Sequence, residues 1–550
     1  MDKFLSASIS DVRRLCEYGF YDYIIVGSGI GGGVLAQSLV EGSKSAKILL
    51  IERGGAIFST HSLNGPRPHW SHDIPEGPSQ DVDIVYHALK TPVNTVTQAS
   101  HPYLGGELYC LGGRGNVWGL YSPKVHPEEL KGNFPEEVSA YLLEKGGYDR
   151  AYRLLANDGD ASLDRPYPDN GAVGAHAVDK ISQVIGNLNE GTKEWGSSFS
   201  HCPLAAEFAT RRPEEALYQF SMGAFSPVNW ILDRVYNRDE RLTVLPNTRV
   251  MTVNRRPEDL SKIVSLTVLD SAGAEQEIPV GKARVILSAG TLGSPSIALR
   301  SGLGEGCLPA TPSGNLVGRG LTDHDLWGTR FEVLQSPHLA TLNSQPLKLN
   351  SWVKFGNDPV LINIAVNANT FMGRTQAKMP TVYLNEGLSE LSETEFKEEL
   401  KKESVTRSVV QIAFSLGAQL EDSNRVLNLP GPETTVQIET IKDHSRHAPL
   451  MQRLARDIGA ALGRSTSGSD QQIPLPPVGK AGFGIVAHEV GTMRMGTGGK
   501  GVVDENLKVN GVENLYVCDL SVLPFSPASN PTLTLVGLTQ RLADHLLRAA

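Results

Sequence analysis

The alternation of apolar and polar residues near the start of the chain predicts a strand, a tight turn, a helix and a second strand. Residues 23–26 form a short apolar run rich in β-branched side chains, which suits a strand buried on both faces. Glycines follow at once, and Val34, Leu35 and Leu39 then place apolar side chains on one side of a helix. A second apolar run, residues 48–51, ends at Glu52. This order indicates a βαβ unit at the N-terminal end of the chain.

Two later regions are predicted to be rich in strands. Residues 241–290 contain short alternating runs that close with a buried strand at 284–287, which indicates a β-meander feeding a parallel strand. Residues 327–440 contain period-2 patterns that predict a large antiparallel sheet with one wet face. The strand candidates of this second region are 329–334, 351–355, 360–366, 381–384, 408–416 and 435–439.

Helices are expected between and after these strands. Residues 389–404 are highly charged and are expected to form a helix with a solvated face, and residues 448–462 form an amphipathic pattern. Pro295 is placed near a helix start, where proline is tolerated. Asn530 precedes the last helix and is a candidate N-cap, with Pro531 in the first turn.

The chain is too long, at 550 residues, for one ordinary core. We predict an α/β fold with a Rossmann-like nucleotide-binding domain and β-meander, formed by residues 1–155, 225–326 and 480–550. A substrate-binding domain built on the large antiparallel sheet, with helices, is expected from residues 156–224 and 327–479.

Composition and charge narrow the function classes. With 40% hydrophobic and 20% charged residues the chain has ordinary globular usage, and its net charge of −9 argues against a nucleic-acid partner. Five scattered cysteines without a CxxC pair make a disulfide framework or a zinc site unexpected. The first twenty residues lack the apolar run of a secretory signal, so we expect an intracellular protein, with a secreted form left open. The most apolar stretch is broken by glycines, so no membrane span is expected.

The turn after the first strand carries the pattern G-x-G-x-x-G at Gly27, Gly29 and Gly32. The first glycine permits a sharp turn, the second lets the backbone approach a pyrophosphate, and the third lets the helix pack closely on the strand. Glu52 lies at the distance where a carboxylate accepts hydrogen bonds from a ribose diol, which disfavours NADP. The motif predicts dinucleotide binding but does not by itself choose between NAD and FAD.

A second glycine-rich loop, residues 109–123, surrounds Trp118. Such a density of glycines lets a backbone lie against a flat or charged group, and a surface Ω-loop is the alternative. Arg114 in this loop either pairs with phosphate or is solvated.

Five stretches together resemble the glucose-methanol-choline (GMC) oxidoreductase superfamily, which is FAD-dependent. They span nearly the whole chain in the family's order: "GSGIGGG" with Glu52, "LGGRGNVWG", "SAGTLGSPSIALRSGLG", "VGRGLTDH", and the C-terminal "HEVGTMRMG…SNPTLT". The resemblance implies that His488 is the catalytic histidine and that Asn530 is its partner. The cofactor-binding residues that the motifs and the resemblance imply are Gly27, Ser28, Gly29, Ile30, Gly32, Glu52, Arg53, Gly112, Gly113, Asn116, Val117, Trp118, Val250, Ala289, Gly290, Asp519, Leu520, Pro531 and Thr532.

The chain also departs from the family pattern. Where the family commonly has serines after the second pair of glycines, this chain has Arg114 and Gly115. Some relatives attach the flavin to a histidine in this loop, but the corresponding place here is near Val117, so we expect non-covalent FAD. Trp118 and the "ASNPTLT" ending are more similar to the pyranose-oxidase branch.

The resemblance implies oxidation of an alcohol, such as a sugar or another hydroxylated small molecule, to a carbonyl. His488 would take the hydroxyl proton, flavin N5 would take the hydride, and oxygen or another acceptor would reoxidise the flavin. Asn530 can hold the substrate oxygen but cannot be a second base. His324 is expected to be structural, and no metal is expected because the residues 323–325 lack a partner cluster in the sequence. A redox-neutral, hydroxynitrile-lyase-like enzyme and a dinucleotide-binding protein without turnover are the alternatives, while the substrate and the oligomeric state stay open.

Overall fold

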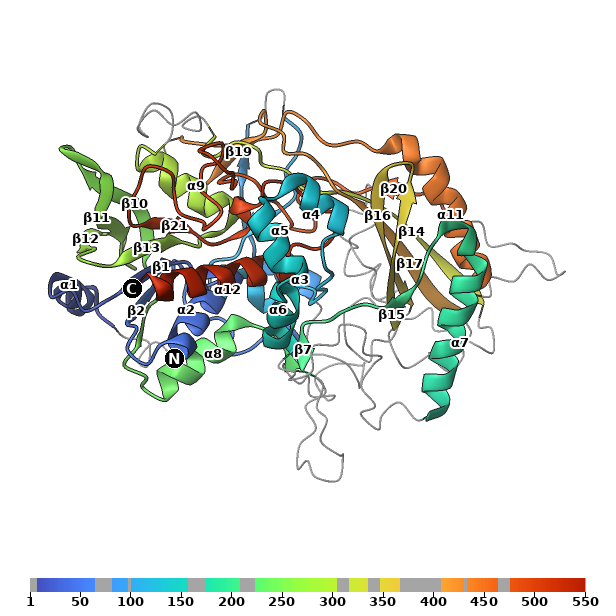
Figure 1. Ribbon diagram of the computed structural model, residues 1–550, viewed down its shortest axis with the longest axis horizontal. Coiled ribbons are helices and arrows are strands. Elements are labelled where there is room, and N and C mark those ends of the chain that lie inside the picture. The colour runs from blue at the N-terminus through green and yellow to red at the C-terminus, as the bar shows by residue number, and fades with distance from the viewer. Residues whose placement is uncertain are drawn as a thin grey trace.

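The computed structural model describes residues 7–64, 82–96, 100–156, 175–207, 223–303, 316–334, 347–366, 407–429, 431, 433–462 and 475–549. The predicted strand at 381–384 and the predicted helix at 389–404 lie outside these ranges. Figure 1 shows two sheet-centred bodies side by side, each covered by helices.

The first body is built on a five-stranded parallel sheet of strand order β21-β13-β1-β2-β9. Its strands are β1 (Tyr23–Val26), β2 (Ile48–Ile51), β9 (Leu242–Leu245), β13 (Arg284–Leu287) and β21 (Leu515–Val517). Strands β1 and β2 are buried along their whole length, because helices cover the faces of a parallel sheet. The first strand of the region predicted as a β-meander, β9, pairs with β2 in this sheet, and only the strands that follow it form the meander.

Two helices from opposite ends of the chain pack together on this sheet. They are α2 (Ile30–Gly42) and α12 (Thr532–Arg548), which lie alongside each other in Figure 1, and α6 (Gly147–Ala156) packs against α12. The meander consists of β10 (Arg249–Arg256), β11 (Asp259–Leu269) and β12 (Glu275–Pro279). Helices α9 (Gly290–Arg300) and α1 (Ile9–Glu17) pack on the meander.

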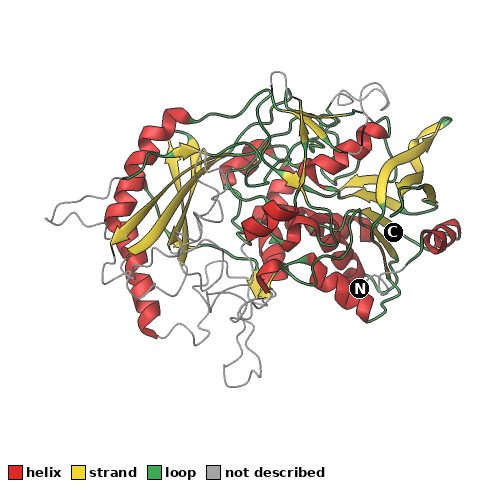
Figure 2. Cartoon of the chain, turned by 180° about the vertical axis from the view of Figure 1, so that it is seen from behind, coloured by secondary structure: helices red, strands yellow, loops and turns green. Residues whose placement is uncertain are grey.

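The second body is a six-stranded sheet of order β20-β14-β17-β16-β15-β6. Its strands are β6 (Ser200–His201), β14 (Asp325–Leu334), β15 (Leu347–Phe355), β16 (Asp358–Val366), β17 (Arg407–Leu416) and β20 (Gly479–Lys480), all paired antiparallel. Helices α7 (Ala175–Gly191) and α11 (Ala448–Ala461) cover its outer face, as Figure 2 shows from behind. Ile362, Ile412 and Phe414 pack in the core beneath these helices.

Smaller elements connect the two bodies. Strands β18 (Arg425–Leu427) and β19 (Thr435–Gln437) form a separate sheet with β4 (Asn94–Thr95). The prediction that residues 435–439 belong to the large sheet is therefore wrong, since their backbone pairs with a strand from the first hundred residues. The other short strands are β3 (Thr91–Pro92), β5 (Gly106–Glu107), β7 (Ala206–Glu207) and β8 (Gly223–Ala224), and the remaining helices include α3 (Val82–Leu89), α4 (Pro127–Asn133), α5 (Glu136–Leu143) and α8 (Pro227–Tyr236).

Two helix boundaries differ from the expectation. Pro295 is the sixth residue of α9 and not near its first position. Helix α12 begins at Thr532 with Pro531 as N-cap and without a side-chain cap bond, so Asn530 lies one residue before the cap. The architecture confirms the predicted α/β class with an antiparallel-sheet body. The four cysteines that the structure describes are free, and Cys307 lies outside the described ranges. Among the described helices, none has the length and apolarity to cross a bilayer.

Candidate active site

A cavity of about 410 Å³ runs from the carboxyl ends of the parallel strands to the inner face of the antiparallel sheet. Val26, Ile51 and Ser288, at or just after the ends of β1, β2 and β13, line one end of it. Ligands bind at this edge of open α/β sheets, because the loops that leave the strands there diverge. His488 and Asn530 line the same cavity.

The first glycine-rich turn forms part of the wall as the sequence predicts. Gly27 has a φ of +101°, and a Cβ there would lie 2.2 Å from the carbonyl oxygen of Ser288. A Cβ on Gly32 would lie 1.9 Å from the carbonyl oxygen of Gly27, so this glycine lets α2 pack on the turn. A Cβ on Gly29, in contrast, would meet nothing within 4 Å, and Gly29 lines the cavity. The turn therefore leaves open space at the residue that is predicted to approach a pyrophosphate.

Glu52 closes this turn from the next strand. Its Oε2 accepts hydrogen bonds from the Ser28 backbone N–H at 3.0 Å and the Ser28 hydroxyl at 2.6 Å, and its Oε1 accepts one from the Gly54 N–H at 2.9 Å. Burial raises the pKa of the Glu52 carboxyl, while the bonds from Ser28 and Gly54 lower it. The Glu52 side chain also lines the cavity, so its carboxyl is at the surface that a bound dinucleotide would touch.

The second glycine-rich loop packs against the first and is not a surface Ω-loop. The Gly112 N–H donates to the Ser28 hydroxyl at 2.9 Å, and a Cβ on Gly113 would lie 3.3 Å from the Gly29 Cα. Asn116 is fully buried, with its amide donating to the Leu111 carbonyl at 2.8 Å. The loop is thus part of the inner wall of the cavity.

The structure brings most of the predicted cofactor residues to this one cavity and leaves four outside its lining. Those in the lining are Gly27, Ser28, Gly29, Ile30, Glu52, Arg53, Gly113, Val117, Trp118, Val250, Ala289, Gly290, Asp519, Leu520 and Thr532. Gly32, Gly112, Asn116 and Pro531 do not line it. Their contacts are with the protein, so they support the shape of the wall.

Asp519 joins α9 to the C-terminal segment. Its carboxylate accepts hydrogen bonds from the Gly290 N–H at 3.0 Å, the Ser294 hydroxyl at 2.5 Å and the Ser521 N–H at 2.9 Å. Burial raises the pKa of this carboxyl, and the bonds from Ser294 and Ser521 oppose that shift. Asp519 therefore fixes the start of α9 against residues 519–521, where Leu520 lines the cavity.

His488 lies between two polar partners at the other end of the cavity. Its Nε2 is 3.2 Å from the Asn530 amide nitrogen, and its Nδ1 is 3.2 Å from Nε2 of His324. The pKa of His488 is well below the ordinary value, because of burial first and then because a proton on His488 would be repelled by any charge on His324 and by the charge of Arg114. The ring is consequently neutral near neutral pH, the form that can accept a proton.

Several lining residues were not among the predicted site residues. Arg114 donates to the fully buried Glu489 carboxylate at 3.1 Å and to the Ala487 carbonyl at 3.3 Å, and the Tyr103 hydroxyl donates to the same carboxylate. Arg249 and Arg300 line the cavity near Arg53, and their pKa values are lowered by burial and then by the charge of Arg53. The sequence left phosphate pairing or solvation open for Arg114, and the structure pairs its side chain with Glu489 instead. Arg249 and Arg300 carry no sequence pattern, since they come together only in the tertiary structure.

The inner face of the large sheet supplies the remaining wall. Strands β16 and β17 pair in register, and their side chains alternate between the core and the cavity. The lining side chains from this sheet are Leu326, Lys348, Asn363, Ala365, Gln411, Ala413 and Ser415. The wall that faces His488 is therefore largely polar or small, as the predicted wet face requires.

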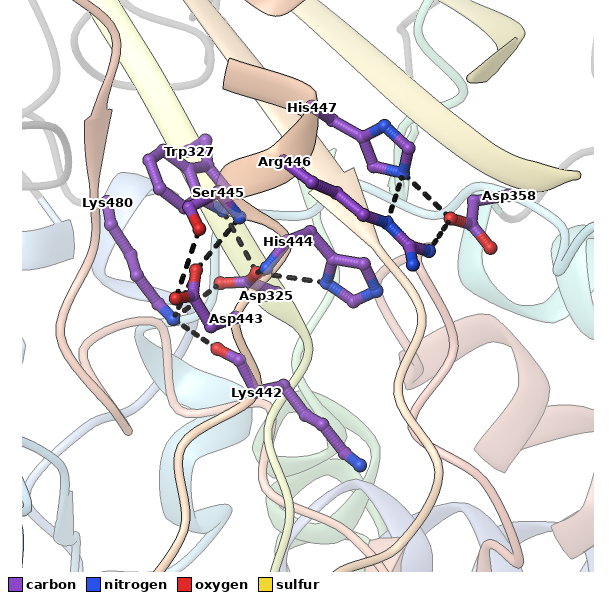
Figure 3. A network of polar contacts seen from close by, with 10 residues as sticks. All are labelled: Asp325, Trp327, Asp358, Lys442, Asp443, His444, Ser445, Arg446, His447 and Lys480. Carbon is purple, nitrogen blue, oxygen red and sulfur yellow. Dashed lines mark hydrogen bonds and ion pairs between the residues drawn. The ribbon is translucent and has the colours of Figure 1, made fainter. Parts of the chain in front are cut away.

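The first residue of β14, Asp325, follows His324 directly and belongs to the polar network drawn in Figure 3. The Asp325 carboxylate accepts hydrogen bonds from the His444 ring at 3.0 Å and the Trp327 indole at 2.9 Å, and lies 3.4 Å from Lys480 Nζ. Burial would raise the pKa of Asp325, but these partners outweigh it and lower the pKa. Farther along, His447 binds Asp358 at 2.8 Å.

Asp323, His324 and His488 place potential metal-ligand atoms within 4.8 Å of one another. The partner that the sequence did not show for Asp323 and His324 is thus His488. The oxygens of Asp323 accept the backbone N–H groups of His324 at 2.8 Å and Gly484 at 3.2 Å, and the two imidazoles bind each other. Each group has a protein partner, so the expectation of no metal is kept as a prediction.

Comparison with known proteins shows what the chain is similar to. The sequence profile of the GMC oxidoreductase family matches residues 451–539. The 5-(hydroxymethyl)furfural oxidase of Methylovorus sp. is 25% identical, with 96% of this chain and 99% of that protein covered. Pyranose 2-oxidase of Emericella nidulans is 30% identical over 26% of each chain. The structure of formate oxidase from Aspergillus oryzae covers 96% of this chain and 98% of that chain, with a TM-score of 0.59 at 16% identity, a likeness of fold.

Proposed function

Because the chain belongs to the GMC oxidoreductase family, flavoenzymes with FAD that act on CH–OH groups, we propose that it oxidises the alcohol group of a polar small molecule to a carbonyl. The observation that carries this proposal is the neutral His488 beside Asn530 in the same cavity as the glycine-rich turn. The match to pyranose 2-oxidase covers only 26% of the chain, so membership of that branch stays a prediction.

The cavity fits FAD. The open space beside Gly29 admits a pyrophosphate, the Glu52 carboxyl lines the cavity where a ribose would lie, and Arg249 and Arg300 add positive charge near Arg53. We propose that the lining residues named above hold FAD, and that Gly32, Gly112, Asn116 and Pro531 support them. Binding is proposed to be non-covalent, because Val117 stands where some relatives attach the flavin and has no nucleophilic atom.

We propose that His488 is the general base of the reaction. An alcohol that replaces the direct hydrogen bond between Nε2 of His488 and the Asn530 amide would donate its proton to the first and accept a hydrogen bond from the second. General-base assistance of this kind is typically worth about 10²–10⁴ in rate. When bound, FAD supplies the acceptor for the hydride. Once protonated, His488 is a cation beside the polar wall and stabilises negative charge nearby.

The polar wall supports a hydroxylated substrate. Asn363, Gln411 and Ser415 offer both donors and acceptors, whereas Ala365 and Ala413 leave room for a ring or a short chain. We propose that oxygen or another small electron acceptor completes the cycle. We propose an FAD-binding domain (1–155, 225–326, 480–550) and a substrate-binding domain (156–224, 327–479), which the two separate cores support except that Cys202, Leu204, Ala205, Ala224 and Leu361 pack in the first core.

A substrate screen under anaerobic conditions tests the proposal. The purified protein should absorb at about 450 nm, as oxidised flavin does, and one or more alcohols should bleach that band. His488→Ala should keep the flavin and lose at least about 10²-fold in the rate of bleaching. If no alcohol or sugar bleaches the flavin, a redox-neutral lyase becomes the better reading, and full activity of His488→Ala would remove the base assignment.

A further inference from the structure

We propose that His324 is a positioning residue that fixes the proton of His488 on Nδ1, so that Nε2 always presents a lone pair to the alcohol. The inference rests on the proposed function, because the position of this proton matters for catalysis only if His488 is the base. A neutral imidazole carries one proton on either nitrogen, and the hydrogen bond at one nitrogen decides the state of the other.

The Pro527 carbonyl, His324 and His488 form a chain of hydrogen bonds, called the relay below. A backbone carbonyl decides which groups in this chain donate and which accept. Nδ1 of His324 lies 3.0 Å from the carbonyl oxygen of Pro527. A carbonyl only accepts hydrogen bonds, so Nδ1 of His324 must carry the proton. Burial lowers the pKa of His324, which keeps its ring neutral. Its Nε2 is therefore an acceptor.

The second bond passes this polarity on to His488. Nδ1 of His488 is 3.2 Å from Nε2 of His324, with the two rings at 87° to each other and their centroids 5.0 Å apart. Since Nε2 of His324 accepts, Nδ1 of His488 donates, and Nε2 of the neutral His488 has no proton.

The opposite end of the chain of bonds requires the same arrangement independently. The Asn530 amide nitrogen lies 3.2 Å from Nε2 of His488, and an amide nitrogen only donates. A proton on Nε2 would place two donors against each other there. Both ends thus assign the lone pair to the nitrogen that faces the cavity.

The carbonyl that starts the relay is held firmly. Ser526 exchanges two backbone hydrogen bonds with Ala418, at 2.8 and 3.0 Å, and the Ala528 N–H donates to the buried Glu129 carboxylate at 3.2 Å. The residues on both sides of Pro527 are therefore anchored. His324 lies between Asp323, which accepts the Gly484 N–H at 3.2 Å, and Asp325, which binds the His444 ring at 3.0 Å; the second bond is drawn in Figure 3.

The relay also favours the protonated state that catalysis creates. When Nε2 of His488 takes a proton, the N–H at Nδ1 becomes part of a cation, and its bond to Nε2 of His324 becomes charge-assisted. A histidine that served only to fill space would not provide this acceptor. His324 lines the cavity but is 7% exposed, so it contacts the base and need not contact the alcohol.

Two variants of His324 and one control separate positioning from packing. Asn at 324 keeps a donor for the Pro527 carbonyl but is too short to reach His488, whereas Gln places an oxygen near the position of Nε2. We expect His324→Asn to reduce the rate of anaerobic flavin reduction by about 10- to 100-fold, the usual cost of losing the outer partner of a functional histidine. His324→Gln should recover most of that loss. His447→Asn, at a buried histidine bonded to Asp358 outside the cavity lining, should leave the rate unchanged.

Nitrogen-15 NMR of histidine-labelled holoenzyme gives a readout that packing does not move. In the wild type, Nε2 of His488, assigned by comparison with His488→Ala, should show the chemical shift of an unprotonated ring nitrogen that accepts a hydrogen bond. His324→Asn should shift it toward the protonated form, and His324→Gln should not. A proton on Nε2 in the wild type would overturn the inference, and so would equal losses of rate in both variants with an unchanged Nε2 signal. Because the spectra require no turnover, they test the hydrogen-bond chain even if no alcohol reduces the flavin, the result that would refute the proposed function.

Discussion

The two glycines Gly29 and Gly32 offer the sharpest test of how the turn after β1 works. A Cβ at Gly32 would lie 1.9 Å from the carbonyl oxygen of Gly27, whereas a Cβ at Gly29 would meet nothing within 4 Å. The same change to alanine, three residues apart, should therefore damage two different properties. Gly32→Ala should weaken folding, and Gly29→Ala should weaken cofactor binding.

The magnitude for Gly32→Ala follows from the clash. Real Cβ atoms essentially never come closer than 3.0 Å to such an atom, so α2 must move by about 1.1 Å, the difference between 3.0 and 1.9 Å. Overpacking against backbone typically costs about 1–3 kcal/mol. Because the clash is with backbone, we take the upper end of that range, about 3 kcal/mol. Alanine in a helix recovers up to about 1 kcal/mol relative to glycine, so we expect a net loss of about 2 kcal/mol in the free energy of unfolding.

For Gly29→Ala the backbone is already extended, with φ −62° and ψ −168° at the N-cap of α2. Alanine is a poorer N-cap than glycine, and the loss of stability from this change is expected to be at most about 1 kcal/mol. The added methyl group projects into the cavity where we place the pyrophosphate. A loss of close backbone contact there should weaken FAD binding by at least about tenfold, or about 1.4 kcal/mol.

The assay measures both properties on both variants. Denaturant unfolding of flavin-free protein gives stability, and titration with FAD, followed by the quenching of flavin fluorescence, gives the dissociation constant. We expect Gly32→Ala to show the larger decrease in the free energy of unfolding. We expect Gly29→Ala to show the larger increase in the dissociation constant of FAD, relative to its own decrease in stability. Wild-type FAD affinity in Gly29→Ala would refute the placement of the pyrophosphate, and wild-type stability in Gly32→Ala would refute the packing argument.

Three further predictions concern pH and metals. Because burial lowers the pKa of His488, a pH–rate profile of flavin reduction should be flat above about pH 6.5 and fall only at lower pH, where the proposed base becomes protonated. A rate that already falls above about pH 6.5 as the pH is lowered would contradict the assignment of His488 as the base. Burial raises the pKa of Glu129 to about 8, above an unfolded value of about 4.3, so between these pH values the folded state holds a proton that unfolding releases. The free energy of unfolding should therefore decrease as the pH rises from about 4.3 to about 8. Glu129→Gln should remove that decline, and equal slopes of stability against pH in denaturant unfolding of both proteins would exclude it. Treatment with EDTA should leave flavin reduction unchanged, and a loss restored by a divalent metal ion would instead assign Asp323, His324 and His488 to a metal site.

The nucleotide-binding part of the fold could be predicted because its signals are local. The strand at 23–26, the spacing of Gly27, Gly29 and Gly32, and the acid at Glu52 all lie within thirty residues, and each has one physical role. The large antiparallel sheet was also predictable from alternation, because one face packs under helices and the other lines a cavity. The strand at 435–437 could not be placed, since alternation predicts a strand but does not identify its partner.

The site beyond the motifs depends on contacts between distant segments. His324 carries no pattern that distinguishes a packed ring from one that orients a base, and its partners Pro527 and His488 are more than 160 residues away in sequence. The same holds for the pair of Arg114 and Glu489. Which atoms of these residues donate and which accept hydrogen bonds is decided by partners that come close only when the chain folds.

Pro295 shows how a local irregularity fixes the distance between cofactor loop and base. A proline inside a helix has no N–H, so the carbonyl four residues earlier, that of Thr291, is left without its helical donor. The hydroxyl of Thr492 donates to that carbonyl at 2.6 Å, and the hydroxyl of Thr291 donates to the Glu489 carbonyl at 2.6 Å. The helix that follows β13 is thereby joined twice to the segment that begins with His488. In a helix without the proline, a backbone N–H would compete with the Thr492 hydroxyl for the Thr291 carbonyl, and the link between α9 and the segment of His488, the proposed base, would be weaker.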